Sequence, residues 1–264
     1  MLTITNVSKT FHKGTVNEKV ALRDINITFE TGDYVTVIGG NGAGKSTLLN
    51  LIAGTYPADG GSILLDGVEL TRLPEHRRAS MLGRVFQDPM MGTAAGMGIE
   101  ENLAMAYRRG RRRGLGWGIS QAERAKYREA LGALDLGLEG RLSTKVGLLS
   151  GGQRQALTLL MATLRKPQLL LLDEHTAALD PRTAQKVLAL SDQLIEENGL
   201  TAMMVTHNMR DAIAHGNRLI MMHEGAIILD ISGEQKRSLT VEALLERFAR
   251  ASGDDFASDR ALLT

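Results

Sequence analysis

Alternating apolar and polar positions predict short β-strands in the opening fifth of the chain. Ile25, Ile27 and Phe29 recur at every second position, which is the side-chain period of a strand. Residues 34–38 lack this alternation, as expected for a strand that is buried on both faces. The strands expected in this part of the chain are residues 2–7, 24–29, 34–38 and 62–65, the last closed by the turn pair Asp66-Gly67.

The pattern becomes helical between about residues 88 and 164, and strands and helices alternate after it. The helices expected in the middle segment span residues 100–109, 121–134 and 153–164. Beyond Pro167 we expect a strand at 169–172, a helix at 181–198, a strand at 201–205, an edge hairpin of residues 218–222 and 226–231, and an amphipathic helix within 240–251. Strand-helix-strand alternation is typical of right-handed βαβ units, so the chain predicts an α/β fold with a mostly parallel sheet.

The composition fits one large or two modest domains without a membrane span. The 264 residues include 31 Lys and Arg against 30 Asp and Glu, and a net charge of +1 gives no overall attraction to nucleic acid or anionic lipid. Cysteine is absent, which excludes disulfides, thiolate metal sites and cysteine nucleophiles. The first twenty residues lack an apolar segment of signal-peptide length, and no apolar run approaches the roughly 18 residues that cross a bilayer. We therefore expect no secretion, and a role at a membrane would require another chain.

A glycine-rich loop of the pattern G-x-x-x-x-G-K-[ST] lies between the strand at 34–38 and a helix expected at 47–53. It consists of Gly39, Gly40, Asn41, Gly42, Ala43, Gly44, Lys45 and Ser46, followed by Thr47. The glycines let successive backbone N–H groups point at phosphate oxygens, and the positive end of the helix attracts the same anion. We expect Lys45 to reach the β- and γ-phosphates and the Ser46 hydroxyl to bind Mg²⁺. The alternative is a glycine turn with a chance lysine.

Two adjacent carboxylates follow the apolar strand at 169–172. Asp173 stands at the end of the strand and suits Mg²⁺ coordination, either directly or through water. Glu174 is one residue further and turned the other way, toward an attacking water. We expect Glu174 to act as a general base or to orient that water. A solvated strand end without a catalytic role is the alternative.

A second glycine-rich segment opens the helix at 153–164. Its sequence LSGGQ is formed by Leu149, Ser150, Gly151, Gly152 and Gln153. By itself this is a second potential anion site at a helix N-terminus. The phosphate loop, LSGGQ, Asp173-Glu174, Ala178-Leu179-Asp180 and His207 occur in the order of the motifs of ATP-binding-cassette (ABC) ATPases. From about Leu2 to Phe248 the chain resembles the nucleotide-binding subunit of an ABC transporter.

The resemblance implies a particular division of the chain. The fold would be a P-loop NTPase core with a mostly parallel sheet, an N-terminal antiparallel β-subdomain and an inserted α-helical subdomain. Residues 1–251 would form one ABC ATPase domain, with the ATP-binding core at 1–87 and 165–239 and the helical signature subdomain at 88–164. Residues 240–264 would be a C-terminal helix and tail.

The resemblance also implies roles for individual residues. Phe11 would stack on adenine, unless it is an ordinary core residue, and Gln87 would sense Mg²⁺ and water. Lys45, Gln87, Glu174 and His207 would form the catalytic set, and Ser46, Gln87 and Asp173 would serve the metal. Ser150, Gly151, Gly152 and Gln153 would close over ATP held by the partner in a head-to-tail dimer, and Asp180 would contact the opposite site. His175 stands where relatives often have Pro, and it would alter that turn or add a titrating group near the site.

The implied function is ATP hydrolysis coupled to solute import, with ATP and Mg²⁺ as the bound cofactors. The protein would be a peripheral subunit at the cytoplasmic face of the inner membrane. The partners would be a second copy, integral membrane permease subunits and an extracytoplasmic substrate-binding protein, with no direct nucleic-acid contact. The methionine-containing stretch 90–97 suits permease docking, unless it is subdomain core. The basic run 108–113 would face lipid headgroups, acidic permease loops, phosphate backbone or solvent. The overall pattern resembles a bacterial subgroup paired with permeases of the branched-chain amino acid type, which implies an amino acid or related small solute.

A soluble ABC ATPase acting on DNA or ribosomes would share the LSGGQ motif and is the main alternative. Only 61 residues separate Gln87 from Leu149, too few for the long coiled coils of chromosome and repair ATPases. Translation-type members usually carry two cassettes, and one is present here. A small-molecule kinase would leave LSGGQ unexplained.

Overall fold

The structure is a computed structural model, which describes residues 1–110 and 118–252. The chain folds into two compact units, one of Met1–Arg78 with Gly199–Thr264 and the other of Ala79–Asn198. The first unit is therefore assembled from the two ends of the sequence, and the second is inserted between them. The subdomain boundaries expected at 88 and 164 stay a prediction, because the second unit also holds residues on both sides of that range.

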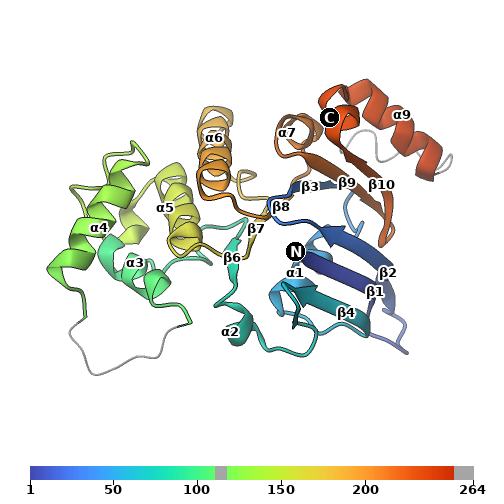
Figure 1. The fold of residues 1–264 in the computed structure, drawn as a ribbon, viewed down its shortest axis with the longest axis horizontal. Coiled ribbons are helices and arrows are strands. Elements are labelled where there is room, and N and C mark those ends of the chain that lie inside the picture. The colour runs from blue at the N-terminus through green and yellow to red at the C-terminus, as the bar shows by residue number, and fades with distance from the viewer. Residues whose placement is uncertain (111–117, 253–264) are drawn as a thin grey trace. The chain divides into compact units, whose positions relative to one another are not determined.

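The first unit contains the antiparallel sheet expected near the N-terminus. It consists of β1 (Leu2–Phe11), β2 (Lys19–Phe29), β4 (Gly60–Leu65) and β5 (Val68–Glu69), in the order β2-β1-β4-β5. Figure 1 labels β2, β1 and β4 of this sheet. Leu2 and Ile4 alternate toward the core and are buried, as the period of two predicts, and a register shift between Ile4 and Val7 brings Val7 to the buried face as well. Strands β1 and β2 are longer than expected because they pair out to Phe11 and Lys19.

A second set of strands in the same unit surrounds β3. The strands β3 (Tyr34–Ile38), β8 (Ala202–Val205), β9 (Arg218–His223) and β10 (Ala226–Ser232) run in the order β10-β9-β3-β8. Strand β3 is parallel to both neighbours and buried throughout, and β9 with β10 forms the expected hairpin. The helices of this unit are α1 (Lys45–Ala53), α2 (Glu75–Arg78), α7 (Met209–Ala214), α8 (Gly233–Arg237) and α9 (Val241–Ser252). Leu244 and Phe248 of α9 pack into one apolar cluster with Ile38 of β3.

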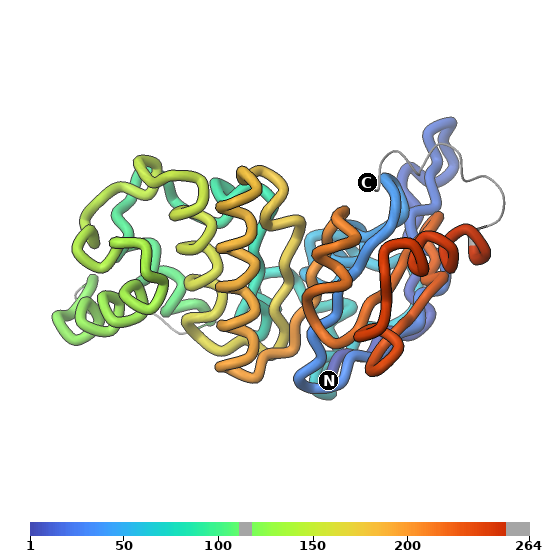
Figure 2. The backbone as a smooth tube through the Cα atoms, turned by 90° about the horizontal axis from the view of Figure 1, so that it is seen from above, coloured from blue at the N-terminus to red at the C-terminus, as the bar shows by residue number. Residues whose placement is uncertain are grey.

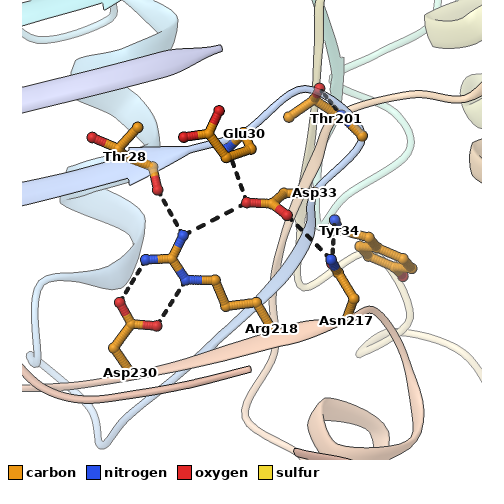
Figure 3. Close-up of polar contacts among 9 residues, drawn as sticks. Thr28, Glu30, Asp33, Tyr34, Thr201, Asn217, Arg218 and Asp230 are labelled. Carbon is orange, nitrogen blue, oxygen red and sulfur yellow. Dashed lines mark hydrogen bonds and ion pairs between the residues drawn. The ribbon is translucent and has the colours of Figure 1, made fainter. Parts of the chain in front are cut away.

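The amino end of β3 is held by a group of polar residues that we name the Arg218 network: Thr28, Asp33, Asn217, Arg218 and Asp230 (Figure 3). The guanidinium of Arg218 donates from Nε and Nη2 to the two carboxylate oxygens of Asp230, at 2.7 and 2.6 Å, and from Nη1 to the carbonyl of Thr28 at 2.6 Å. Asn217 donates to Asp33 at 3.1 Å and accepts from the backbone N–H of Tyr34 at 2.7 Å. The network therefore joins β2, β3, β9 and β10 at one edge.

The second unit is mainly helical. The strands β6 (Leu82–Val85) and β7 (Leu169–Asp173) pair in parallel, and the α-helices are α3 (Ile99–Tyr107), α4 (Gln121–Gly132), α5 (Gly151–Thr163) and α6 (Pro181–Asn198), with a 3₁₀ turn, η1 (Val146–Leu148). Leu103, Tyr127 and Leu157 lie at the centre of its core and are fully buried. Helices α5 and α6 run side by side (Figure 2). Within the described residues, no helix combines the length and apolarity that a membrane span requires.

Candidate nucleotide-binding site

The loop between β3 and α1 takes a shape that glycine makes possible. Gly39, Gly42 and Gly44 have φ angles of +151°, +81° and +102°. A Cβ atom at Gly39 would lie 2.2 Å from the carbonyl oxygen of Met222, and one at Gly44 would lie 2.7 Å from that of Ala21. Gly39 and Gly44 therefore exclude any side chain, both by conformation and by close approach of the neighbouring backbone, whereas Gly42 is favoured by its conformation alone.

Lys45 begins α1, and its ammonium is folded back into the loop. Its Nζ donates to the carbonyl oxygens of Gly39 and Gly40, at 2.8 and 3.1 Å, and the residue is only 6% exposed. A cation at the amino end of a helix opposes the positive end of the helix dipole. An anion held between Lys45 and the loop N–H groups reverses that penalty, so the geometry fits a phosphate-binding site. Ser46, the next residue, is exposed.

The strand end that carries Phe11 lies beside this loop. Phe11 pairs with Lys19 in the β1–β2 register, and the Lys19 ammonium is 3.4 Å from the position of a Cβ atom on Gly42. The Phe11 ring meets Tyr56 edge to face, with 5.3 Å between centroids. The sequence prediction missed both Lys19 and Tyr56, because the strand expected at 2–7 ends before Phe11 and the register that places Lys19 opposite Phe11 appears only in the structure.

His207 lies at the same edge of the sheet as the phosphate loop. It follows β8, which is parallel to β3, so the carboxyl ends of both strands meet at one edge. Next to it, the Thr206 N–H donates to the Val37 carbonyl at 3.1 Å, and the Asn208 side chain caps α7 by accepting from the N–H of Arg210 at 2.9 Å. The exposed His207 is thus anchored on both sides.

The two predicted carboxylates belong to the second unit. Asp173 is the last residue of β7, and its Oδ2 lies 3.7 Å from Nη2 of Arg84 on β6, with both side chains 15% exposed. The same guanidinium stacks over the ring of Phe86, 4.4 Å from its centroid. Glu174 follows with a φ of +42° in the left-handed region, so the chain turns sharply between the two carboxylates. Sequence reasoning did not identify Arg84 as a neighbour of Asp173.

The LSGGQ segment forms the amino end of α5. Ser150 accepts from the Gln153 N–H at 3.2 Å, and Gln153 accepts in return from the Ser150 N–H at 3.3 Å, which is a capping box. A Cβ atom on Gly152 would lie 2.3 Å from the Thr183 methyl group of α6, so this glycine lets the two helices approach. Ser150 and Gly151 are exposed.

Asp180 and Gln87 stand next to elements of the same unit. Asp180 accepts from the Thr183 N–H at 3.1 Å, which caps the amino end of α6, and hydrogen bonds from Thr183 lower the pKa of its carboxyl group. The exposed Gln87 follows β6 by two residues. Its neighbour Phe86 accepts through its carbonyl from the side chain of Gln155 on α5, at 3.3 Å.

The predicted site residues therefore fall into two sets. Phe11, Gly39 to Thr47 and His207 belong to the first unit, where the parallel strands β3 and β8 bring the loop and His207 to one edge and Phe11 pairs with Lys19, the neighbour of Gly42. Gln87, Ser150 to Gln153, Asp173, Glu174 and Asp180 belong to the second.

The comparisons with known proteins identify the family. A family model described as ABC transporter matches residues 22–177, more than half of the chain. The chain belongs to the ABC transporter family. It is an ABC ATPase, which binds and hydrolyses ATP, and its fold is the P-loop NTPase α/β fold that the sequence predicted.

Relatives and a solved structure extend this result. The chain is 43% identical to the tyrosine transport ATP-binding protein of Clostridioides difficile (strain R20291), over 95% of this chain and 100% of the relative. It is 35% identical to the methionine import ATP-binding protein MetN of Corynebacterium efficiens, over 84% of this chain and 60% of that longer relative. The dimeric post-hydrolysis structure of the cassette MJ0796 with ADP and phosphate has a TM-score of 0.74 and 30% identity, and covers 88% of this chain and 98% of its own.

Proposed function

We propose that this ABC ATPase energises the uptake of an amino acid or a related small solute through a separate membrane permease. The observation that carries the proposal is the similarity to the tyrosine transport ATP-binding protein, because it extends over nearly the whole of both chains. The name of the methionine relative also refers to import. Activity on nucleic acid or ribosomes is not favoured by these relatives.

In the proposed site, the adenine ring stacks on Phe11 and the phosphates occupy the loop from Gly39 to Thr47. Lys45 then moves its hydrogen bonds from the two glycine carbonyls to the β- and γ-phosphate oxygens. Because the ammonium is already inside the loop, little side-chain freedom is lost on binding. From the second unit, we assign Gln87, Asp173 and Glu174 to the same nucleotide.

The donor atoms proposed for the metal fit Mg²⁺. Ser46, Gln87 and Asp173 offer a hydroxyl, an amide and a carboxylate oxygen, which are the hard ligands that this ion prefers, alongside water and phosphate oxygens. Asp173 faces Arg84 at 3.7 Å, beyond hydrogen-bond distance. When bound, Mg²⁺ neutralises the charge on the β- and γ-phosphates.

Glu174 is the proposed general base or water-orienting residue. His207 contacts the γ-phosphate and orients Glu174 and the attacking water. Phosphoryl transfer to water depends on positioning and charge stabilisation. Because Glu174 acts on the attacking water and the phosphate loop holds the phosphates, loss of Glu174 leaves ATP binding intact. Glu174→Gln should keep the ATP dissociation constant within about twofold and lower turnover by about 100-fold or more. Steady-state hydrolysis and titration with a fluorescent ATP analogue measure the two quantities, and a normal turnover number would remove Glu174 from this role.

We propose a head-to-tail homodimer in which Ser150, Gly151, Gly152 and Gln153 of one subunit cover ATP held by the other, and Asp180 contacts the opposite site. The exposure of Ser150 and Gly151 and the dimeric state of the similar cassette support it. ATP that contacts both subunits favours the closed dimer, and hydrolysis removes that preference. Size-exclusion chromatography of the Glu174→Gln variant should therefore show a dimer with ATP and a monomer with ADP.

The proposed permease contact is the stretch 90–97, which would face the permease at the cytoplasmic side of the inner membrane. An extracytoplasmic substrate-binding protein would complete the importer. Met90 and Met91 are 43% and 71% exposed, which supports a docking role. In the basic run, Arg108 pairs with Glu123 at 2.8 Å and Arg109 donates to the Ala162 carbonyl at 3.2 Å, while 111–113 lie outside the described residues. Co-purification with the native permease and identification of the bound solute test the proposal, and recovery on ribosomes or DNA would overturn it.

A further inference from the structure

A buried histidine stands next to Glu174 without a part in the chemistry above. His175 is 2% exposed and belongs to the turn that joins β7 to α6. Its Nε2 lies 3.0 Å from Oγ of Ser191, a residue in the middle of α6 that is fully buried. The side chain therefore reaches from the turn into the packed side of the helix.

The direction of this hydrogen bond follows from the hydroxyl group. Ser191 has one O–H, and it donates to the Val187 carbonyl at 2.8 Å, one helical turn earlier. Its oxygen is left to accept, so His175 donates from Nε2–H. This assignment rests on the network around the ring. The hydrogen bond thus holds the Nε2 side of the imidazole against a partner on α6.

The residue that most needs this support is Glu174. Its φ of +42° is a left-handed conformation that residues with side chains rarely adopt. The turn is closed by hydrogen bonds from the Ala177 N–H to the Glu174 carbonyl at 3.0 Å and from the Leu179 N–H to the Thr176 carbonyl at 3.1 Å. These bonds are local to the turn, whereas His175 connects it to the body of the unit.

We propose that His175 is a positioning residue, which ties the turn after β7 to α6 through Ser191 and thereby fixes the direction in which Glu174 presents its carboxylate. The inference rests on the proposed role of Glu174 in hydrolysis. Small displacements of a water-orienting group have large effects on rate, while ATP binding does not depend on that group. Loss of the anchor should therefore lower turnover without weakening ATP binding.

The test compares His175→Leu and Ser191→Ala in the full chain. We expect the turnover number to fall about tenfold in the first and several-fold in the second, with the dissociation constant of a fluorescent ATP analogue unchanged within about twofold. His175→Gln retains an N–H near the position of Nε2 and should recover most of the turnover. Thr163→Val is the matched control, since Thr163 on α5 is also buried and its hydroxyl also donates to a carbonyl one turn earlier, that of Leu159 at 2.9 Å.

Two further measurements separate positioning from general stability. Hydrogen exchange of the Ala177 amide, which closes the turn at Glu174, should accelerate in Ser191→Ala and stay unchanged in Thr163→Val. In a Glu174→Gln background, adding Ser191→Ala should leave the residual turnover unchanged, because the carboxylate that it positions is gone.

The inference is overturned by wild-type turnover in both His175→Leu and Ser191→Ala, by a parallel loss of ATP affinity, or by an equal loss of turnover in the Glu174→Gln background. Failure of the proposed role of Glu174 has a different signature, namely wild-type turnover in Glu174→Gln alone. If His175→Leu does not fold, Ser191→Ala still decides the question, since it removes one hydroxyl from a helix.

Discussion

The two ends of β3 carry polar groups that are organised in opposite ways. At its amino end, the charged and polar groups of the Arg218 network pair with one another across four strands (Figure 3). At its carboxyl end the loop is shaped by glycines whose neighbours leave no room for side chains, and it holds the Lys45 cation among carbonyl groups. The first arrangement stabilises the fold, and the second prepares a place for an anion.

The difference teaches how one strand serves both purposes. The hydrogen bonds that Arg218 donates to Asp230 raise the pKa of Arg218 above its usual value, because the carboxylate stabilises the charged guanidinium. Lys45 instead lies at the positive end of α1 and donates to carbonyl oxygens of the loop, in a position where a bound anion is favoured. Substitutions at the amino end should therefore affect stability, and those at the carboxyl end should affect nucleotide binding and turnover.

The largest effect is expected for Lys45→Met. Removal of the ammonium takes away a direct phosphate contact, so turnover should fall by about 100-fold or more while the free energy of unfolding changes little. Hydrolysis assays and urea unfolding followed by circular dichroism measure the two quantities. Lys13→Met, at an exposed lysine, is the control. An unfolded Lys45→Met protein would show that both ends of β3 are structural.

Arg218→Met should produce the opposite result. It leaves the carboxylates of Asp33 and Asp230 without their cation, and we expect a loss of about 2–3 kcal/mol in the free energy of unfolding. Below the unfolding transition, the turnover number should stay near that of the wild type. Arg237→Met removes an exposed ion pair, in which Nη1 of Arg237 lies 2.7 Å from Oε1 of Glu234, and it should change stability little. Equal effects of the two substitutions in urea would contradict a structural role for the network.

Gly44→Ala tests whether the loop is defined by its neighbours or by its backbone angle alone. Gly14 has a φ of +77° and open space around it, whereas a Cβ on Gly44, with a φ of +102°, would meet Ala21. Gly14→Ala should therefore cost about 1 kcal/mol in stability, and Gly44→Ala about 2 kcal/mol or more together with weaker ATP binding. Unfolding curves and nucleotide titrations of both variants make the comparison. If the two variants lose the same stability and bind ATP equally well, the steric explanation is wrong.

The smallest effect on stability is expected for Tyr127→Phe. It serves as a reference, because the Tyr127 hydroxyl is a buried polar group that belongs to neither end of β3. The Tyr127 hydroxyl is buried and lacks a hydrogen-bond partner among the described residues, and burial raises its pKa to about 12. The unfolded tyrosine ionises near pH 10 and the buried one near pH 12, so raising the pH from 10 to 12 ionises the unfolded state first and lowers the stability of the wild type. The variant should match or slightly exceed wild-type stability at pH 7 and lose less stability between pH 10 and 12. Melting temperatures across this range test it, and identical alkaline curves would contradict it.

The sequence predicted the long or strongly patterned elements most accurately. The bounds expected for β3 and α6 agree with the structure, because a buried apolar run and a helix that begins at a proline are local signals. The short elements β5, β6, α2, α7 and α8 were missed, since a few residues do not establish a period. The strand expected at 2–7 ended too early and the one expected at 24–29 began too late, because the end of β1 and the start of β2 are held by pairing with each other rather than by hydrophobic alternation.

The sequence by itself determined the phosphate loop, the carboxylate pair after β7 and the LSGGQ segment, and through them the family. Each is a contiguous run in which glycines, a lysine or carboxylates have a fixed spacing, so the chemistry is encoded locally. Only the tertiary structure decided which residues support these segments. Arg218 contacts Thr28 across 190 positions and His175 contacts Ser191 across 16. Such contacts depend on how strands and helices pack, and no spacing along the chain specifies them.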